Sequence, residues 1–224
     1  MTDDSRIWVK VCANTSLEDA QLAAEAGADA VGFVFAPSPR RVTVEQAAAI
    51  ALRLPAGLEK IGVFVDASLD EICAAVRACG LTGVQFHSAV APELTVQLRE
   101  RLGSHIRILR VVHFGADAAE QARQVAADPN VDAILVDSRT ATAVGGTGIT
   151  FDWTEARTTI FQNADAGRRL IAAGGLTPDN VCEAIAVLRP WGIDVASGVE
   201  ASPGRKDPEK VRRFVANARA SGPR

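Results

Sequence analysis

The chain has 224 residues, of which 48% are hydrophobic and 23% are charged, and its formal net charge is −3. Basic and acidic residues are interleaved, which excludes the basic face that a nucleic acid requires, and no apolar run is long enough to cross a membrane. The first residues lack the pattern of a signal peptide, so we expect a cytoplasmic protein. Length and composition predict a single domain over residues 1–224, with a frayed tail at 220–224.

Eight short apolar runs alternate with alanine-rich amphipathic stretches along the chain. The runs are nearly continuous in their apolar character, which is typical of parallel strands that helices cover on both faces. The predicted strands are Ile7–Val11, Ala30–Val34, Lys60–Val65, Gly83–Phe86, Ile106–Val112, Ala133–Val136, Arg169–Ala172 and Ile193–Ala196.

Helix boundaries are marked by capping residues. A hydroxyl residue followed three positions later by Glu or Gln predicts a capping box at Thr15–Glu18, Thr43–Gln46 and Ser68–Glu71. Gly27 and Gly80 follow helical stretches and are expected to end them.

Two glycine-rich turns follow the last two predicted strands, at Ala172–Leu176 and Ala196–Glu200. Backbone N–H groups in such turns can hold a phosphate, because glycine lets the chain approach closely. An open doubly wound sheet would instead carry its glycines after the first strand, where this chain has Cys12–Thr15. The pattern therefore predicts the α/β class and a single-domain (β/α)8 TIM barrel with a phosphate site formed by Gly174, Gly175, Ser197 and Gly198.

Active sites of such barrels lie at the carboxyl ends of the strands, where Cys12 and Asp137 are found. Cys12 is either a small buried hydrophobe or a thiolate that acts as base or nucleophile, supported by the nearby Lys10. Asp137 either caps the following turn or acts as a proton donor whose pKa the apolar mouth raises. Together they would form an acid and base pair.

An arginine in the proline-containing loop after the second strand is a candidate anion ligand. Arg40 and Arg41 are both available to hold a carboxylate, and simple solvation at the surface is the alternative for either.

Further polar residues follow the middle strands. Gln85 and His87 lie at the fourth strand, and His87 and His113 are alternative proton carriers or packing residues. Gly146 belongs to the glycine-rich segment 144–148, which either closes over a substrate or simply connects two elements.

The four cysteines show no metal-ligand spacing with histidine or with one another, so we predict reduced thiols and no metal site. They are Cys12, Cys73, Cys79 and Cys182.

Taken in order, motifs along nearly the whole chain resemble the phosphoribosylanthranilate isomerase family. The motifs are Val9–Thr15, Gly32–Phe35 with Ser38–Arg40, Gly62–Val65, Val84–His87, Gly145–Gly148 with Phe151–Trp153, Ala173–Leu176 with Pro178 and Asn180–Val181, and Asp194–Glu200.

The resemblance implies an isomerase of tryptophan biosynthesis. It would convert N-(5-phosphoribosyl)anthranilate to 1-(2-carboxyphenylamino)-1-deoxyribulose 5-phosphate by an Amadori rearrangement, without metal or organic cofactor. The family's general base falls on Cys12, its general acid on Asp137, and the arginine that positions the anthranilate on Arg40. The expected partner is a small phosphorylated substrate, and the expected assembly is a monomer or a homodimer.

Three positions depart from the family pattern. Ala13 stands where the family usually has glycine, and an alanine with positive φ would strain the turn beside the base. Ser88 also replaces a glycine, and Ala196 replaces a frequent serine. They leave two other hypotheses open: a related phosphosugar isomerase or specialised-pathway paralogue, and a binding module without catalysis.

Overall fold

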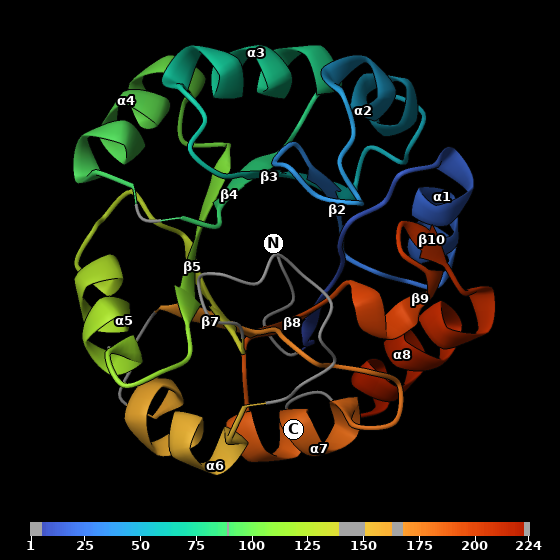
Figure 1. Ribbon diagram of the computed structural model, residues 1–224, viewed down its shortest axis with the longest axis vertical. Coiled ribbons are helices and arrows are strands. Elements are labelled where there is room, and N and C mark those ends of the chain that lie inside the picture. Colours follow the sequence, from blue (N-terminus) through green and yellow to red (C-terminus); the bar gives the residue numbers. More distant parts are fainter. Residues whose placement is uncertain (1–5, 89, 139–150, 163–167, 222–224) are drawn as a thin grey trace.

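Eight parallel strands form a closed barrel in chain order, from β1 to β8, and helices surround it (Figure 1). The structure is a computed structural model, and it describes residues 6–88, 90–138, 151–162 and 168–221. The barrel strands are β1 (Trp8–Val11), β2 (Ala30–Val34), β3 (Glu59–Phe64), β4 (Gly83–Phe86), β5 (Arg107–His113), β6 (Ala133–Asp137), β7 (Arg169–Ala172) and β8 (Gly192–Val195). The predicted (β/α)8 barrel is confirmed.

The helices of the outer ring are α1 (Leu17–Glu25), α2 (Val44–Ala51), α3 (Leu69–Cys79), α4 (Pro92–Leu102), α5 (Ala118–Ala126), α6 (Trp153–Ala156), α7 (Val181–Leu188) and α8 (Pro208–Ala220). A π-helical turn, Arg157–Phe161, continues α6. Helix α8 includes Ala220, so of the tail expected at 220–224 the first residue is helical, and residues 222–224 lie outside the described part.

The predicted strands agree with the structure to within two residues at either end. One element was not predicted: after β8 and a 3-10 turn, a small antiparallel hairpin forms from β9 (Glu200–Ser202) and β10 (Arg205–Lys206). Such short strands contain no apolar run, so periodicity gives no signal for them. In Figure 1 the hairpin lies between α1 and α8.

Local capping explains where several helices begin. Capping boxes form at Thr43 and Ser68 as predicted, and Gly80 ends α3 in the left-handed region with φ 59°. The prediction at Thr15 is wrong: Ser16 caps α1 and accepts from the backbone N–H of Asp19. The Thr15 hydroxyl donates instead to the carbonyl of Gly204, because the hairpin packs there.

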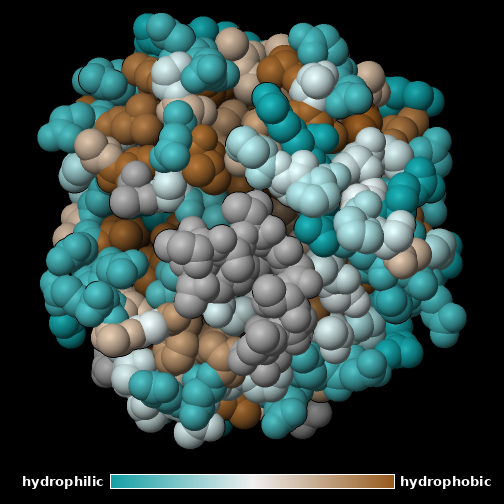
Figure 2. All heavy atoms as spheres, viewed as in Figure 1, coloured by the Kyte–Doolittle hydropathy of each residue, from teal (hydrophilic) through white to brown (hydrophobic). Residues whose placement is uncertain are grey.

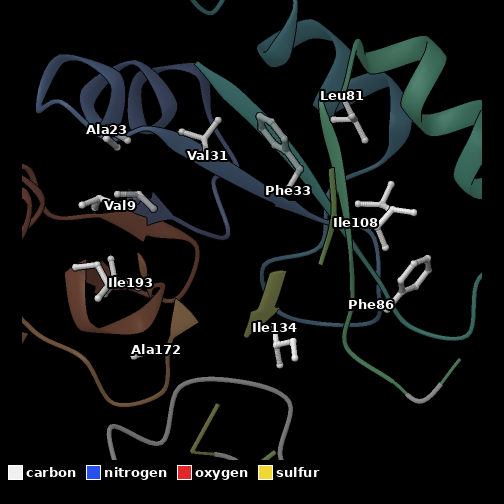
Figure 3. Packing of buried hydrophobic residues seen from close by; sticks show 14 of the residues in the cluster. Val9, Ala23, Val31, Phe33, Leu81, Phe86, Ile108, Ile134, Ala172 and Ile193 are labelled. Carbon is white, nitrogen blue, oxygen red and sulfur yellow. The ribbon is translucent and has the colours of Figure 1, made fainter. Parts of the chain in front are cut away.

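Two apolar layers hold the barrel together. Outward-facing strand residues pack against the helices, and Figure 3 shows Val9, Phe33 and Ile108 among them. A second cluster fills part of the barrel interior and contains Trp8, Leu109 and Ile171. Hydrophilic residues dominate the outer rim of the face drawn in Figure 2. Among the described residues, no helix has the length and apolar character needed to span a membrane.

The turns after β7 and β8 touch through Gly198. A Cβ atom built on this glycine would lie 1.8 Å from the carbonyl oxygen of Leu176, which no side chain tolerates without backbone movement. We predict that Gly198→Ala lowers the free energy of unfolding by about 3 kcal/mol, at the upper end of overpacking costs.

Urea unfolding followed by circular dichroism measures this change. Gly57→Ala is the matched control, because a Cβ at that position meets nothing within 4 Å, and its effect is expected to stay within about 0.5 kcal/mol. Equal stability of the two variants would contradict the close approach.

Candidate active site

A cavity that is partly open to solvent lies at the carboxyl ends of the strands. Its lining includes the polar and charged residues Cys12, Arg40, Gln85, His87, Asp137 and Asp194.

Cys12 is the first residue after β1, and a tight turn holds it in place. Its backbone N–H donates to Val195 on β8 at 2.8 Å, which joins the first and last strands at this point. The buried side chain of Asn14 donates back to the carbonyl of Val11 at 2.8 Å. Between them, Ala13 has φ 62°, so the expected strain beside the thiol is present.

Space for the thiol comes from Gly32 on β2. A Cβ atom there would lie 2.5 Å from Cys12 Sγ and 3.1 Å from Lys10 Cε. Any larger residue at position 32 would therefore displace both side chains.

The environment of Cys12 acts on its thiol in opposing ways. Burial raises the pKa of Cys12, while the positive charges of Lys10 and Lys206 oppose this rise and the carboxylate of Asp194 adds to it. The formation of a Cys12 thiolate that could act as a base therefore depends on the charges around it.

Lys10 is completely buried inside the barrel. Its Nζ lies 2.8 Å from Asp194 Oδ1 and donates to Gln85 Oε1 at 2.9 Å. Burial lowers the pKa of Lys10, but the charges of Asp194 and Cys12 outweigh that effect and raise it above its ordinary value. Sequence reasoning considered Lys10 and Gln85 but missed Asp194, although it lies within one of the quoted motifs.

Arg40 lines the cavity, whereas Arg41 is exposed. The Arg40 side chain is held by Glu200 on β9: Nε donates to Oε1 at 2.8 Å and Nη2 donates to Oε2 at 2.7 Å. Nη1 takes no part in this pair. Lys206 Nζ lies 3.5 Å from Glu200 Oε1 and donates to the carbonyl of Ala196.

Sequence reasoning missed Glu200 and Lys206 as site residues. Glu200 ends a quoted motif, but only the unpredicted hairpin shows that its carboxylate turns toward the loop that follows β2.

Asp137 is the last residue of β6 and lines the same cavity as Cys12. His87 follows β4, and its Nε2 lies 4.0 Å from Asp137 Oδ2. The ring of His113, at the end of β5, packs edge-on against His87 with ring centres 5.1 Å apart. The structure thus brings Cys12, His87 and Asp137 to one cavity, while His113 contacts it through His87.

The glycine turns after β7 and β8 have the expected close backbone. Gly174 and Gly175 have φ 81° and 66°, and a Cβ on Gly174 would overlap Ser138 Oγ at 2.2 Å. Among the described lining residues the cavity reaches Ala196 and stops before Ser197, so the turns lie next to it. Gly146 lies outside the described residues.

Within the described part of the chain, no group of three or more His, Cys, Asp or Glu side chains is arranged to hold a metal ion.

The strained alanine gives a testable stability effect. A left-handed residue with a Cβ costs roughly 1–2 kcal/mol, and glycine's greater freedom in the unfolded chain offsets about half of that. We predict that Ala13→Gly raises the free energy of unfolding by about 0.5–1 kcal/mol in urea titrations. Ala48→Gly, in the middle of α2, is the control and should lower it by about 1 kcal/mol. A loss of stability in Ala13→Gly would refute the strain.

Comparison with known proteins agrees with this geometry. Residues 9–217 match the family model described as N-(5'phosphoribosyl)anthranilate (PRA) isomerase. A relative of that name from Pelobacter propionicus is 45% identical over 210 residues, which cover 93% of this chain and 94% of the relative.

Solved structures give the same result. The phosphoribosyl anthranilate isomerase of Thermotoga maritima superposes with a TM-score of 0.84 at 38% identity, covering 96% of this chain and 99% of that one. A phosphoribosyl anthranilate isomerase in complex with reduced 1-(O-carboxyphenylamino)-1-deoxyribulose 5-phosphate superposes with a TM-score of 0.80 at 35% identity, with the same coverage. The chain therefore belongs to the N-(5'-phosphoribosyl)anthranilate isomerase family.

Proposed function

We propose that this chain carries out the family's reaction with Cys12 as general base and Asp137 as general acid. The reaction is the Amadori rearrangement of N-(5'-phosphoribosyl)anthranilate to 1-(2-carboxyphenylamino)-1-deoxyribulose 5-phosphate, a step of tryptophan biosynthesis. The residue roles rest on one observation: the thiol that follows β1 and the carboxyl group that ends β6 line the same cavity.

Two proton transfers on the sugar need these two groups. Asp137 delivers a proton to the ring oxygen, the bond from carbon 1 to that oxygen breaks, and the nitrogen lone pair forms an iminium. The thiolate of Cys12 then removes the proton from carbon 2, which the iminium has made acidic, and an enolamine forms. Protonation at carbon 1 and loss of the proton on the carbon 2 hydroxyl give the ketone.

Substrate anchoring places the sugar between acid and base. The anthranilate carboxylate is assigned to Arg40, whose Nη1 is left over by the pair with Glu200. The phosphate is assigned to the turns that contain Gly174, Gly175, Ser197 and Gly198, where glycine backbone lets the amides approach it. His87 and Gln85 line the space between, and Gly146 is assigned to the substrate by resemblance alone.

Four other predictions about the chain accompany this one. It forms a single domain, it is a monomer or a homodimer, and it works in the cytoplasm without metal or organic cofactor. The alternative of a specialised-pathway paralogue rests on the left-handed Ala13 beside the base. Growth of a tryptophan auxotroph that lacks this isomerase step, with this chain as its only replacement, decides between the two.

Replacing either proton-transfer group tests the roles directly. General acid and base catalysis contributes typically 10²–10⁴-fold each, so Cys12→Ser and Asp137→Asn should each lower kcat by at least about 100-fold. The assay follows the loss of substrate fluorescence with enzymatically generated N-(5'-phosphoribosyl)anthranilate. Cys182→Ser, at an exposed cysteine, is the control and should keep the parent rate. Parent-like turnover in both site variants would refute the assignment.

The adjacent arginines offer a matched pair for the carboxylate. A charged hydrogen bond contributes about 1.5–3 kcal/mol, so Arg40→Ala should raise KM roughly 10–100-fold, while kcat falls less. Arg41→Ala, at the exposed neighbour, should leave both constants unchanged. Thermal melting of both variants checks that the loop and hairpin still fold. An unchanged KM in folded Arg40→Ala would assign the carboxylate to another group.

A further inference from the structure

A lysine without any exposed surface stands in the interior of the barrel, directly below the cavity. Lys10 lies on β1 between Trp8, which belongs to the interior apolar cluster, and Cys12, which lines the cavity. Alternation along the strand turns all three side chains inward. Burying a cation is costly unless other groups compensate it, so a lysine here needs a physical reason.

Two other strands hold its ammonium group. Lys10 is paired with Asp194 in the register between β1 and β8, and their charged atoms lie 2.8 Å apart. Gln85 reaches the same nitrogen from β4, at 2.9 Å. The position of the charge is thus determined by three strands.

The ammonium is held next to the thiol. Lys10 lies on β1 and Cys12 is the first residue after it, and Cys12 Sγ and Lys10 Cε both lie against the same point beside Gly32. A glycine at this position leaves room for the two groups to be neighbours.

Several other charges face Cys12. Asp194 on β8, Lys206 on β10 and Arg40 in the loop after β2 all interact with it electrostatically, and His87 and Asp137 line the same cavity. Of the groups that favour the thiolate, Lys10 has the largest effect, and Asp194 opposes it.

We propose that Lys10 is the positioning residue of the general base: its ammonium, held by Asp194 and Gln85, stabilises the thiolate of Cys12. This inference rests on the proposed role of Cys12. It assigns opposite effects to the two members of one ion pair. Removing the charge of Lys10 disfavours the thiolate, whereas removing the charge of Asp194 favours it. If the pair served only packing, removing either partner would change the reactivity of the Cys12 thiol in the same direction.

Alkylation of Cys12 measures the thiolate without turnover. The folded proteins, without substrate, react with iodoacetamide between pH 6 and 10, and mass spectrometry of the Cys12 peptide separates it from Cys73, Cys79 and Cys182. An opposite charge within about 4–6 Å changes the ionisation of a group at least tenfold. Lys10→Met should therefore react at least about tenfold more slowly below the parent midpoint. Asp194→Asn should react faster, and Lys10→Arg should stay within about threefold of the parent.

Lys60→Met is the matched control. Lys60 is another buried lysine, but its Nζ donates to the carbonyl of Pro55, so the alkylation of Cys12 should not change. If Lys10→Met does not fold, as judged by thermal melting, faster alkylation in Asp194→Asn together with parent-like alkylation in Lys10→Arg still decides the question. An unchanged profile in Lys10→Met, or slower alkylation in Asp194→Asn, overturns the proposal.

The pH profile of kcat/KM links the thiol to catalysis. Activity that needs the thiolate is lost as the pH falls, so the acidic limb of Lys10→Met should move to higher pH and that of Asp194→Asn to lower pH. If alkylation follows the proposal but Cys12→Ser keeps its activity, the role of Cys12 fails and the charge on Lys10 stands. If Cys12→Ser is inactive and the alkylation of Cys12 does not change in Lys10→Met, the role of Cys12 stands and the proposal for Lys10 fails.

Discussion

The register between β1 and β8 determines which side chains meet inside the barrel. Closing the sheet pairs Lys10 with Asp194 and joins the backbone of Cys12 to Val195. A slip of one residue would turn every inward group of β1 outward, because side chains alternate along a strand. The thiol, the lysine beneath it and the carboxylate that holds the lysine are therefore products of one backbone alignment.

The interior of this barrel is layered by polarity. An apolar cluster that includes Trp8 and Leu109 forms one layer, the charged group around Lys10 lies above it, and the cavity follows. A buried ion pair is weak evidence of stabilisation, since removing two charges from water offsets their attraction. The thiol at the mouth is a better reason for keeping the pair. Burial alone favours the neutral form of Cys12, and the charge of Lys10 opposes that effect.

Much of the fold and part of the site could be predicted from the sequence, because the relevant signals are local. Apolar runs indicate the eight strands, Thr43 and Ser68 carry their own capping partners, and Cys12 and Asp137 follow strands directly. Contacts between distant segments could not be predicted. Arg40 and Glu200 are 160 residues apart, and the hydroxyl of Thr15 is bound by Gly204, 189 residues later, so it does not cap its own helix. No local pattern encodes such meetings, which arise only when the barrel closes.

The hairpin formed by β9 and β10 follows the last barrel strand, yet it holds the arginine that follows the second strand. During translation, Cys12 and Arg40 leave the ribosome long before Asp194, Glu200 and Lys206 exist. A nascent chain without the last strand–helix unit has Lys10 beside Cys12, but it lacks Asp194, which holds Lys10, and Glu200, which holds Arg40. The charged surroundings of Cys12 and Arg40 are therefore complete only after β8, β9 and β10 have folded against the earlier strands.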